Sequence, residues 1–530
     1  MQLRIARALL LLHGAGLALP SAAAWELTGS NTLRIESYHV DGDKRYSPYA
    51  REGTFVYNDI DLSLFGSSTP GQTWRFDFAG TLTDSPYRSV HSGLVPEVMR
   101  VSYDNATAAV PFRVDLGDQN VQFSELTLSR TLKAARLTLR PDSGIDGRSY
   151  WASAVVGSDG QQWRDFDPTA DLYHGFSLGL QDQRLGSYSL NVVHNSREGS
   201  GSLADADQWT ASLTAQRGFD VAGQRLNLRG ELAYFHGDAS DGRSDSGLGY
   251  YLQLDGKSGQ SRPLDYRLRY DRYSSGFHPH GSAAPADSEA ILAEGGWRFR
   301  QDAQVRGRLQ RSRTGISTAD PVVTDSAGLS VIGPLLPGQP QKLVGQLDLS
   351  LQTRESESNH VDMLAKSVQG SITVNHSPRH QSRLSGSMAT VDDLNHPGVE
   401  RVTRQFAVGH TAKLKVRGLD LTVTPGVSIT EIQTQDSEIT MGPTLAISAS
   451  NERQRLLLEV GQSELNATDP ADDVEQARVS LKYEIRRGRH SFGVDLDRTL
   501  REPSEGEDTD AWRAGMYWRY DLGKSLGGAG

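Results

Sequence analysis

The sequence predicts an all-β protein, a single transmembrane antiparallel β-barrel of roughly 20 to 24 strands with short periplasmic turns and long outer loops. Three observations lead to this prediction. Apolar and polar residues alternate over runs of about ten residues, turn residues separate the runs, and residues 1–24 have the pattern of an export signal. Because successive side chains of a strand point to opposite faces, the alternation gives each strand one apolar and one polar face.

The alternation is clearest near the C-terminus. Phe492, Val494 and Leu496 are interleaved with serine, glycine and aspartate, and residues 512–522 repeat the pattern with aromatic residues. If the apolar faces meet lipid, the polar faces line the interior of the barrel. The side chains predicted to line this pore are Arg225, Arg229, Glu231, Arg267, Arg269, Asp271, Arg306, Arg308, Arg478, Lys482, Glu484, Arg513 and Arg519.

A soluble sandwich of two sheets would show the same alternation, because each sheet has one face in the core and one in water. The connections favour the barrel. Short ones, such as Gln301-Asp302 and Arg417-Gly418, tend to alternate with longer polar ones, such as 274–287 and 498–510. This asymmetry is typical of outer-membrane barrels, and an even number of strands places both termini on the periplasmic side.

Two regions fit the pattern less well. The alternation fades between Thr353 and Val402. Residues 313–341 contain four prolines and are predicted to form the longest loop. The apolar stretch 329–336 within it is compatible with a loop that folds inward, but an ordinary outer loop fits it better.

The N-terminal segment is predicted to be a cleaved signal peptide. Arg4 and Arg7 precede a short apolar stretch, and Ala22-Ala23-Ala24 supplies the small residues of a cleavage site. This divides the chain into a signal peptide, 1–24, and an outer-membrane barrel, 25–530. No later segment approaches the ~20 apolar residues of a membrane helix, and the mean hydropathy of −0.48 is compatible with strands that alternate.

The composition excludes several classes of function. The chain has no cysteine, so disulfides and thiolate metal sites are excluded. The net charge is −10, and no basic block with interleaved aromatic residues suggests a nucleic-acid partner. His278 and His280 have no third metal ligand at a helpful spacing, and no Gly-x-Ser-x-Gly motif occurs. The sequence therefore predicts no enzyme, no metal site and no cofactor.

One segment interrupts the regular succession of strands. Residues 116–128 read Leu-Gly-Asp-Gln-Asn-Val-Gln-Phe-Ser-Glu-Leu-Thr-Leu. The segment resembles the Gly-Asp, Phe-Ser and Leu-Thr-Leu stretch of some large outer-membrane barrels associated with export of surface proteins or polymers. Gly117 and Asp118 either bend the strand so that the segment with Phe123 enters the lumen, or belong to a plain hairpin.

The polar faces carry charges of both signs with an excess of arginine and lysine, which implies a water-filled interior. The sequence therefore predicts a porin-like or exporter-like barrel that forms an aqueous pore for a large surface polymer or a secreted protein. The alternatives are a partner-docking barrel with a closed lumen and a small-solute porin with a mild preference for anions. The predicted partners are the outer-membrane bilayer, the barrel-assembly machinery, the exported polymer or protein and a separate periplasmic adaptor.

Overall fold

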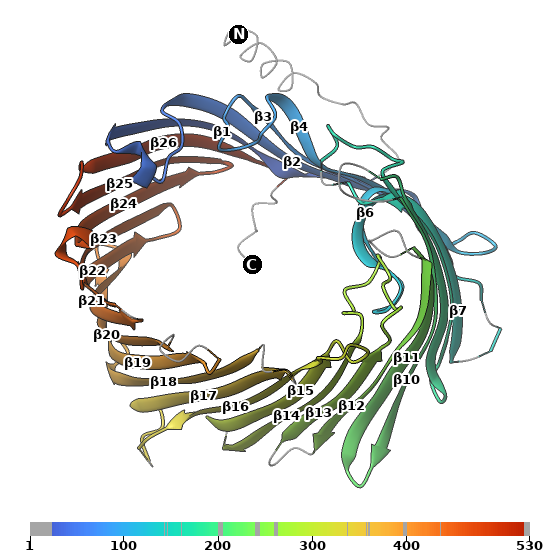
Figure 1. Ribbon diagram of the computed structural model, residues 1–530. Coiled ribbons are helices and arrows are strands. Elements are labelled where there is room, and N and C mark those ends of the chain that lie inside the picture. The colour runs from blue at the N-terminus through green and yellow to red at the C-terminus, as the bar shows by residue number, and fades with distance from the viewer. Residues whose placement is uncertain are drawn as a thin grey trace.

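The chain forms one ring of antiparallel strands in the computed structural model (Figure 1). The first strand, β1 (Ala24–Gly42), pairs with the last, β26 (Thr509–Leu522), from Gly29 opposite Leu522 to Gly42 opposite Thr509. This pairing closes the ring, so that neither end strand has a free edge. In a bilayer, closure also satisfies backbone polar groups that water cannot reach. The prediction of an all-β single barrel is confirmed.

The structure describes residues 24–523 except 143, 146, 161, 200–204, 239–243, 259–262, 301, 337, 357, 359–360, 396–399 and 435. The predicted signal peptide lies outside these residues apart from Ala24, at which β1 begins. Two short 3-10 turns, η1 (Lys44–Tyr46) and η2 (Pro470–Asp472), are the helices of the described residues. Neither has the length or the apolar character of a membrane-spanning helix.

The first half of the ring contains β2 (Gly53–Thr69), β3 (Gln72–Thr83), β4 (Gly93–Asn105), β5 (Phe112–Gln122), β6 (Ser129–Leu139), β7 (Arg148–Ser158), β8 (Asp171–Asp182), β9 (Gly186–Arg197), β10 (Ala206–Val221), β11 (Gln224–Asp238), β12 (Ser244–Ser258) and β13 (Leu264–Tyr273). The second half contains β14 (Ser288–Arg300), β15 (Ala303–Thr314), β16 (Val322–Pro334), β17 (Leu343–Ser356), β18 (Asp362–Ser377), β19 (His380–Asp393), β20 (Glu400–Val416), β21 (Leu419–Gln433), β22 (Ser437–Ser450), β23 (Gln454–Ala467), β24 (Val474–Arg487) and β25 (His490–Pro503).

The ring has 26 strands, two more than the upper end of the predicted range. The interpretation of 313–341 as one long loop is wrong, because β16 lies within it and pairs with β15 and β17. Two features hid this strand. Its polar face consists of small residues (Thr324, Ser326, Gly328 and Ser330), so the alternation has little contrast. Pro321 precedes the strand directly and Pro334 is its last residue, so that the prolines suggested a loop. A proline is tolerated at the end of a strand.

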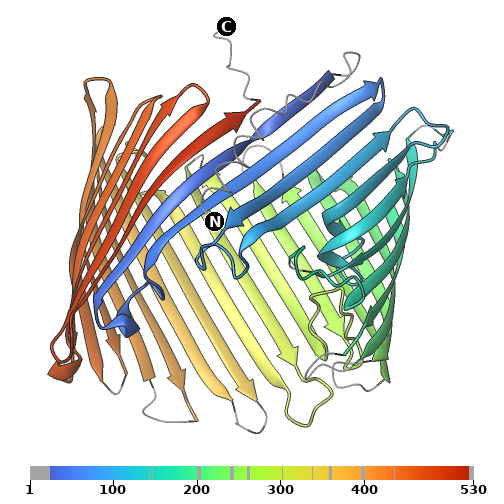
Figure 2. The same ribbon diagram turned by 90° about the horizontal axis from the view of Figure 1, so that it is seen from above.

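The strands are strongly tilted and their two ends differ (Figure 2). At one end, here called the short-turn end, most connections are brief. The turn at Ala222 and Gly223 and the turn at Arg417 and Gly418 contain two residues each, all with positive φ, as tight hairpins require. The start of β1 and the end of β26 also lie there, since Ala24 pairs with Ser67 beside the turn between β2 and β3. The opposite, long-loop end carries connections such as 43–52, 84–92 and 274–287.

Candidate functional site

The inward faces of the strands carry the charged side chains. Leu228 on β11, Leu268 on β13 and Leu309 on β15 are exposed on the outer face, so the residues between them point inward. The strand alternation places all the predicted pore-lining side chains on this inner face, on β11, β13, β15, β24 and β26. Their role in conduction stays a prediction.

Most of these charges are paired with a neighbour of opposite sign. Arg267 lies 2.8 Å from Asp255, Arg269 lies 2.7 Å from Asp271, and Arg519 lies 2.8 Å from Asp521. Arg513 contacts three carboxylates, Glu36, Asp495 and Asp497, at 2.5 to 3.0 Å. Glu484 accepts a hydrogen bond from Tyr517 at 2.8 Å. Pairing across strands cancels much of the positive potential that the arginines alone would create.

Solvent reaches the paired charges. The side chain of Arg308 is 56% exposed, that of Arg519 is 50% exposed and that of Arg267 is 46% exposed, although all three face the interior. Arginines in a dry core would carry a large desolvation cost. The interior beside β15, β26 and β13 is therefore wet.

A hairpin leaves the wall and enters the barrel at β5 and β6. β5 pairs with β4 only from Phe112 to Gly117, and β6 pairs with β7 only from Lys133 to Leu139. The two strands stay paired with each other up to Gln122 opposite Ser129. The rest of the hairpin therefore bends away from the wall, and Figure 1 shows β6 inside the ring.

The bend occurs at Gly117 and Asp118. Gly117 has φ +96°, and a Cβ there would lie 2.0 Å from the carbonyl oxygen of Met99. The Asp118 carboxylate accepts a hydrogen bond from the backbone N–H of Met99 at 2.7 Å and one from the Trp163 indole at 2.5 Å. The backbone N–H of Met99, which has no partner on β5 beyond the end of the β4–β5 pairing, is thus satisfied by the Asp118 side chain.

The tip of the hairpin packs on the inner wall. Leu126 and Leu128 are 2% and 0% exposed, and Leu126 packs in a cluster with Phe235, Tyr251 and other inward residues of β11 to β13. Phe123 packs against a second inward cluster that includes Val155 and Tyr173. Each such buried apolar side chain contributes roughly 1.5–3 kcal/mol relative to exposure.

Polar contacts also hold the tip in place. Glu125 lies 3.3 Å from Arg229 and 3.0 Å from Arg269. Ser124 and Ser212 share a hydrogen bond of 3.2 Å, and the backbone N–H of Leu126 donates to Glu231 at 3.3 Å. Three of the predicted pore-lining residues, Arg229, Glu231 and Arg269, therefore bind the hairpin tip.

A loop from the long-loop end covers the tip. The connection 274–287 places Phe277, which is 0% exposed, in the same cluster as Leu126. Gly281 accepts a hydrogen bond from the backbone of Ser129 at 2.9 Å, and Ser282 donates to the carbonyl oxygen of Glu125 at 2.8 Å. His280 lies 3.3 Å from Asp171. Among the described residues, no three His, Asp or Glu side chains are arranged to hold a metal ion.

The sequence alone predicted 274–287 as a long polar connection between strands and not as an inward segment. A signal was present, because the alternation is lost on β11, against which the loop packs. Ala233, Tyr234 and Phe235 are consecutive apolar residues on β11, and Ala233 and Phe235 belong to the cluster that contains Phe277. Where both faces of a strand are apolar, one face meets lipid and the other needs an apolar cover inside the barrel.

No protein-family model matches the chain, and no curated protein matches it. Solved structures with a similar fold include the translocation pore of the P pilus usher PapC, at 11% identity and a TM-score of 0.38 over 94% of this chain and all of that chain. PapC in the E. coli P pilus tip assembly intermediate PapC-PapD-PapK-PapG gives a TM-score of 0.48 at 11% identity, over 94% of this chain and 61% of that one. OccK10 (OpdN) of Pseudomonas aeruginosa gives 0.33 at 14% identity, over 68% and 99%.

These similarities are in barrel architecture. The closed ring of antiparallel strands itself defines the class of the protein, a large single β-barrel.

Proposed function

We propose that the chain forms a water-filled channel across the bacterial outer membrane and that the infolded hairpin narrows the channel on one side. The observation that carries the proposal is the exposure of inward-facing charges such as Arg308 and Arg519. In this proposal the short-turn end faces the periplasm, as is usual for outer-membrane barrels, and the chain acts as a channel and not as an enzyme.

Export of a large surface polymer or a secreted protein is the favoured role. About 16 to 18 strands already enclose an aqueous channel, and this ring has 26. A wall on which most of the charges are paired, as Arg267 is with Asp255 and Arg513 with Asp497, binds a passing polymer more weakly than a wall of unpaired charges. A separate periplasmic adaptor would deliver the cargo to the short-turn end.

Planar-bilayer recording of the purified full chain tests the proposal. We expect open-channel conductance larger than that of a 16-stranded porin measured in the same salt. We also expect little preference between K⁺ and Cl⁻, because most of the lumenal arginines are paired with carboxylates. A barrel that inserts but stays electrically silent would contradict the channel and support a docking barrel with a closed lumen. A strong preference for Cl⁻ would instead favour the small-solute anion porin.

A further inference from the structure

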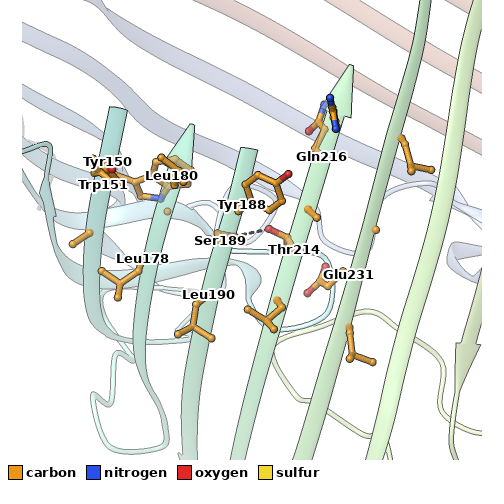
Figure 3. A pocket seen from close by; sticks show the side chains of 18 of the residues that line it. Tyr150, Trp151, Leu178, Leu180, Tyr188, Ser189, Leu190, Thr214, Gln216 and Glu231 are labelled. Carbon is orange, nitrogen blue, oxygen red and sulfur yellow. Dashed lines mark hydrogen bonds between the residues drawn. The ribbon is translucent and has the colours of Figure 1, made fainter. Parts of the chain in front are cut away.

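A concavity of about 1030 Å³ lies on the outer face of the wall and extends over β7 to β12. The leucines that line it are exposed on the outside of the barrel: Leu213 is 60% exposed, Leu232 is 52% exposed and Leu252 is 54% exposed. Figure 3 shows the lining side chains, with the opposite wall of the barrel behind them. We call this concavity the outer groove.

Two small residues form the floor of the outer groove. Ala215 on β10 lies opposite Gly230 on β11, and the strand alternation places both on the same face as Leu213 and Leu232. The neighbouring leucines project beyond these two positions. The result is a shallow depression between the leucines. Its volume is close to the upper limit for ordinary ligand pockets, which is roughly 1,000 Å³.

The two ends of the groove differ in polarity. Tyr150 and Tyr188 lie at one end, and Leu178 and Leu190 lie further along (Figure 3). The polar end is the short-turn end, where Arg217 also lines the groove. Tyrosine favours the level of lipid headgroups, and a long basic side chain extends its charge to the same level.

Arg217 is available to a ligand. Its side chain is exposed and lies opposite Leu228 of β11, and among the described residues no carboxylate lies within ion-pair distance of it. A guanidinium group binds a phosphate through parallel hydrogen bonds. In a bilayer no water fills the apolar part of the groove, so hydrocarbon chains must cover it.

We infer that the outer groove binds one diacyl phospholipid from the leaflet on the short-turn side. The acyl chains lie over Ala215 and Gly230 between the leucines, and the phosphate contacts Arg217. The inference requires only that the barrel spans a membrane, and it is independent of what the channel carries.

Native mass spectrometry of the purified full chain tests this inference, with phosphatidylglycerol and a diacylglycerol of the same chain lengths as probes. We expect the wild-type barrel to retain one phosphatidylglycerol in preference to the diacylglycerol. Arg217→Gln should weaken phosphatidylglycerol binding about fivefold and leave diacylglycerol binding unchanged. Ala215→Phe should fill the floor and weaken the binding of both lipids.

Two control variants change the outer face elsewhere. Arg404→Gln removes an outward arginine near the long-loop end that is paired with Glu431 at 2.8 Å, and Ala477→Phe enlarges an outward alanine on β24, outside the groove. Both should bind phosphatidylglycerol like the wild type, and circular dichroism should show the same strand content for all four variants. Equal retention by wild type, Arg217→Gln and Ala215→Phe would overturn the inference, because the bound lipid would then be a non-specific annular one.

Discussion

Asp118 and Lys133 face each other across the hairpin of β5 and β6, with the Lys133 Nζ 2.7 Å from the Asp118 Oδ1. The pair lies where the hairpin leaves the wall. β5 stops pairing with β4 after Gly117. On the other strand of the hairpin, β6 begins to pair with β7 at Lys133. The Lys133 side chain is 2% exposed and also lies over the Trp163 ring at 4.6 Å. The bend is therefore fixed by a buried ion pair and an aromatic ring.

Asp118→Ala should destabilise the barrel by about 3 kcal/mol, because it leaves a buried ammonium without its partner. It also removes the acceptor for Met99 N–H and for the Trp163 indole. The free energy of unfolding in detergent, measured by denaturant titration, gives the size of the effect. Asp104→Ala, at the solvated end of β4 with its weaker contact to Arg140 at 3.3 Å, is the matched control. Equal losses in the two variants would show that the bend does not depend on this ion pair.

Glu125→Gln should shift ion selectivity towards anions. The substitution keeps the shape of the tip but removes the carboxylate that Arg229 and Arg269 share. Arg269 keeps its ion pair with Asp271, whereas Arg229 loses its carboxylate partner, and an unneutralised lumenal arginine favours anions. The reversal potential in a KCl gradient measures the shift. Glu475→Gln makes the same change in net charge on the outer face and should leave the reversal potential unchanged. A reversal potential unaltered by Glu125→Gln would place the tip outside the conducting path.

Cysteines placed at Ser124 and Ser212 should form a disulfide in the membrane. The two hydroxyl oxygens lie 3.2 Å apart, and the chain has no cysteine of its own, so any cross-link reports this pair alone. A change in gel mobility on reduction detects the bond. The pair Ser124→Cys and Ser382→Cys should not cross-link, because Ser382 lies on β19, away from the strands that hold the tip. If the first pair stays reduced under oxidising conditions, the hairpin does not lie against β10 in the membrane.

The barrel was predictable because its strongest signal is local. A period of two, as in Phe492, Val494 and Leu496, needs no knowledge of partners. β16 was not predictable in this way, since small polar residues blur its inner face and its pairing with β15 and β17 is what defines it. The inward packing of Leu126 beside Phe277 joins segments about 150 residues apart. Local periodicity carries no information on such a contact. The consecutive apolar residues from Ala233 to Phe235 nevertheless indicate that the inner face of β11 is covered by another apolar segment.

Leu309→Arg and Gln310→Arg, at adjacent positions of β15, test the assignment of the two faces. Leu309 is 62% exposed on the outer face, whereas Gln310 accepts a hydrogen bond from Arg308 at 2.7 Å on the inner face. An arginine facing hydrocarbon near the midplane costs about 2–4 kcal/mol, and one facing the water-filled lumen costs little. Unfolding of the two variants in lipid vesicles should therefore show a loss of stability for Leu309→Arg alone. The Gln310→Arg variant should instead raise the preference for anions, which reversal potentials can measure. Equal stability of the two variants would mean that β15 does not have one face in lipid and the other in water, and the membrane-spanning interpretation of the ring would then be wrong.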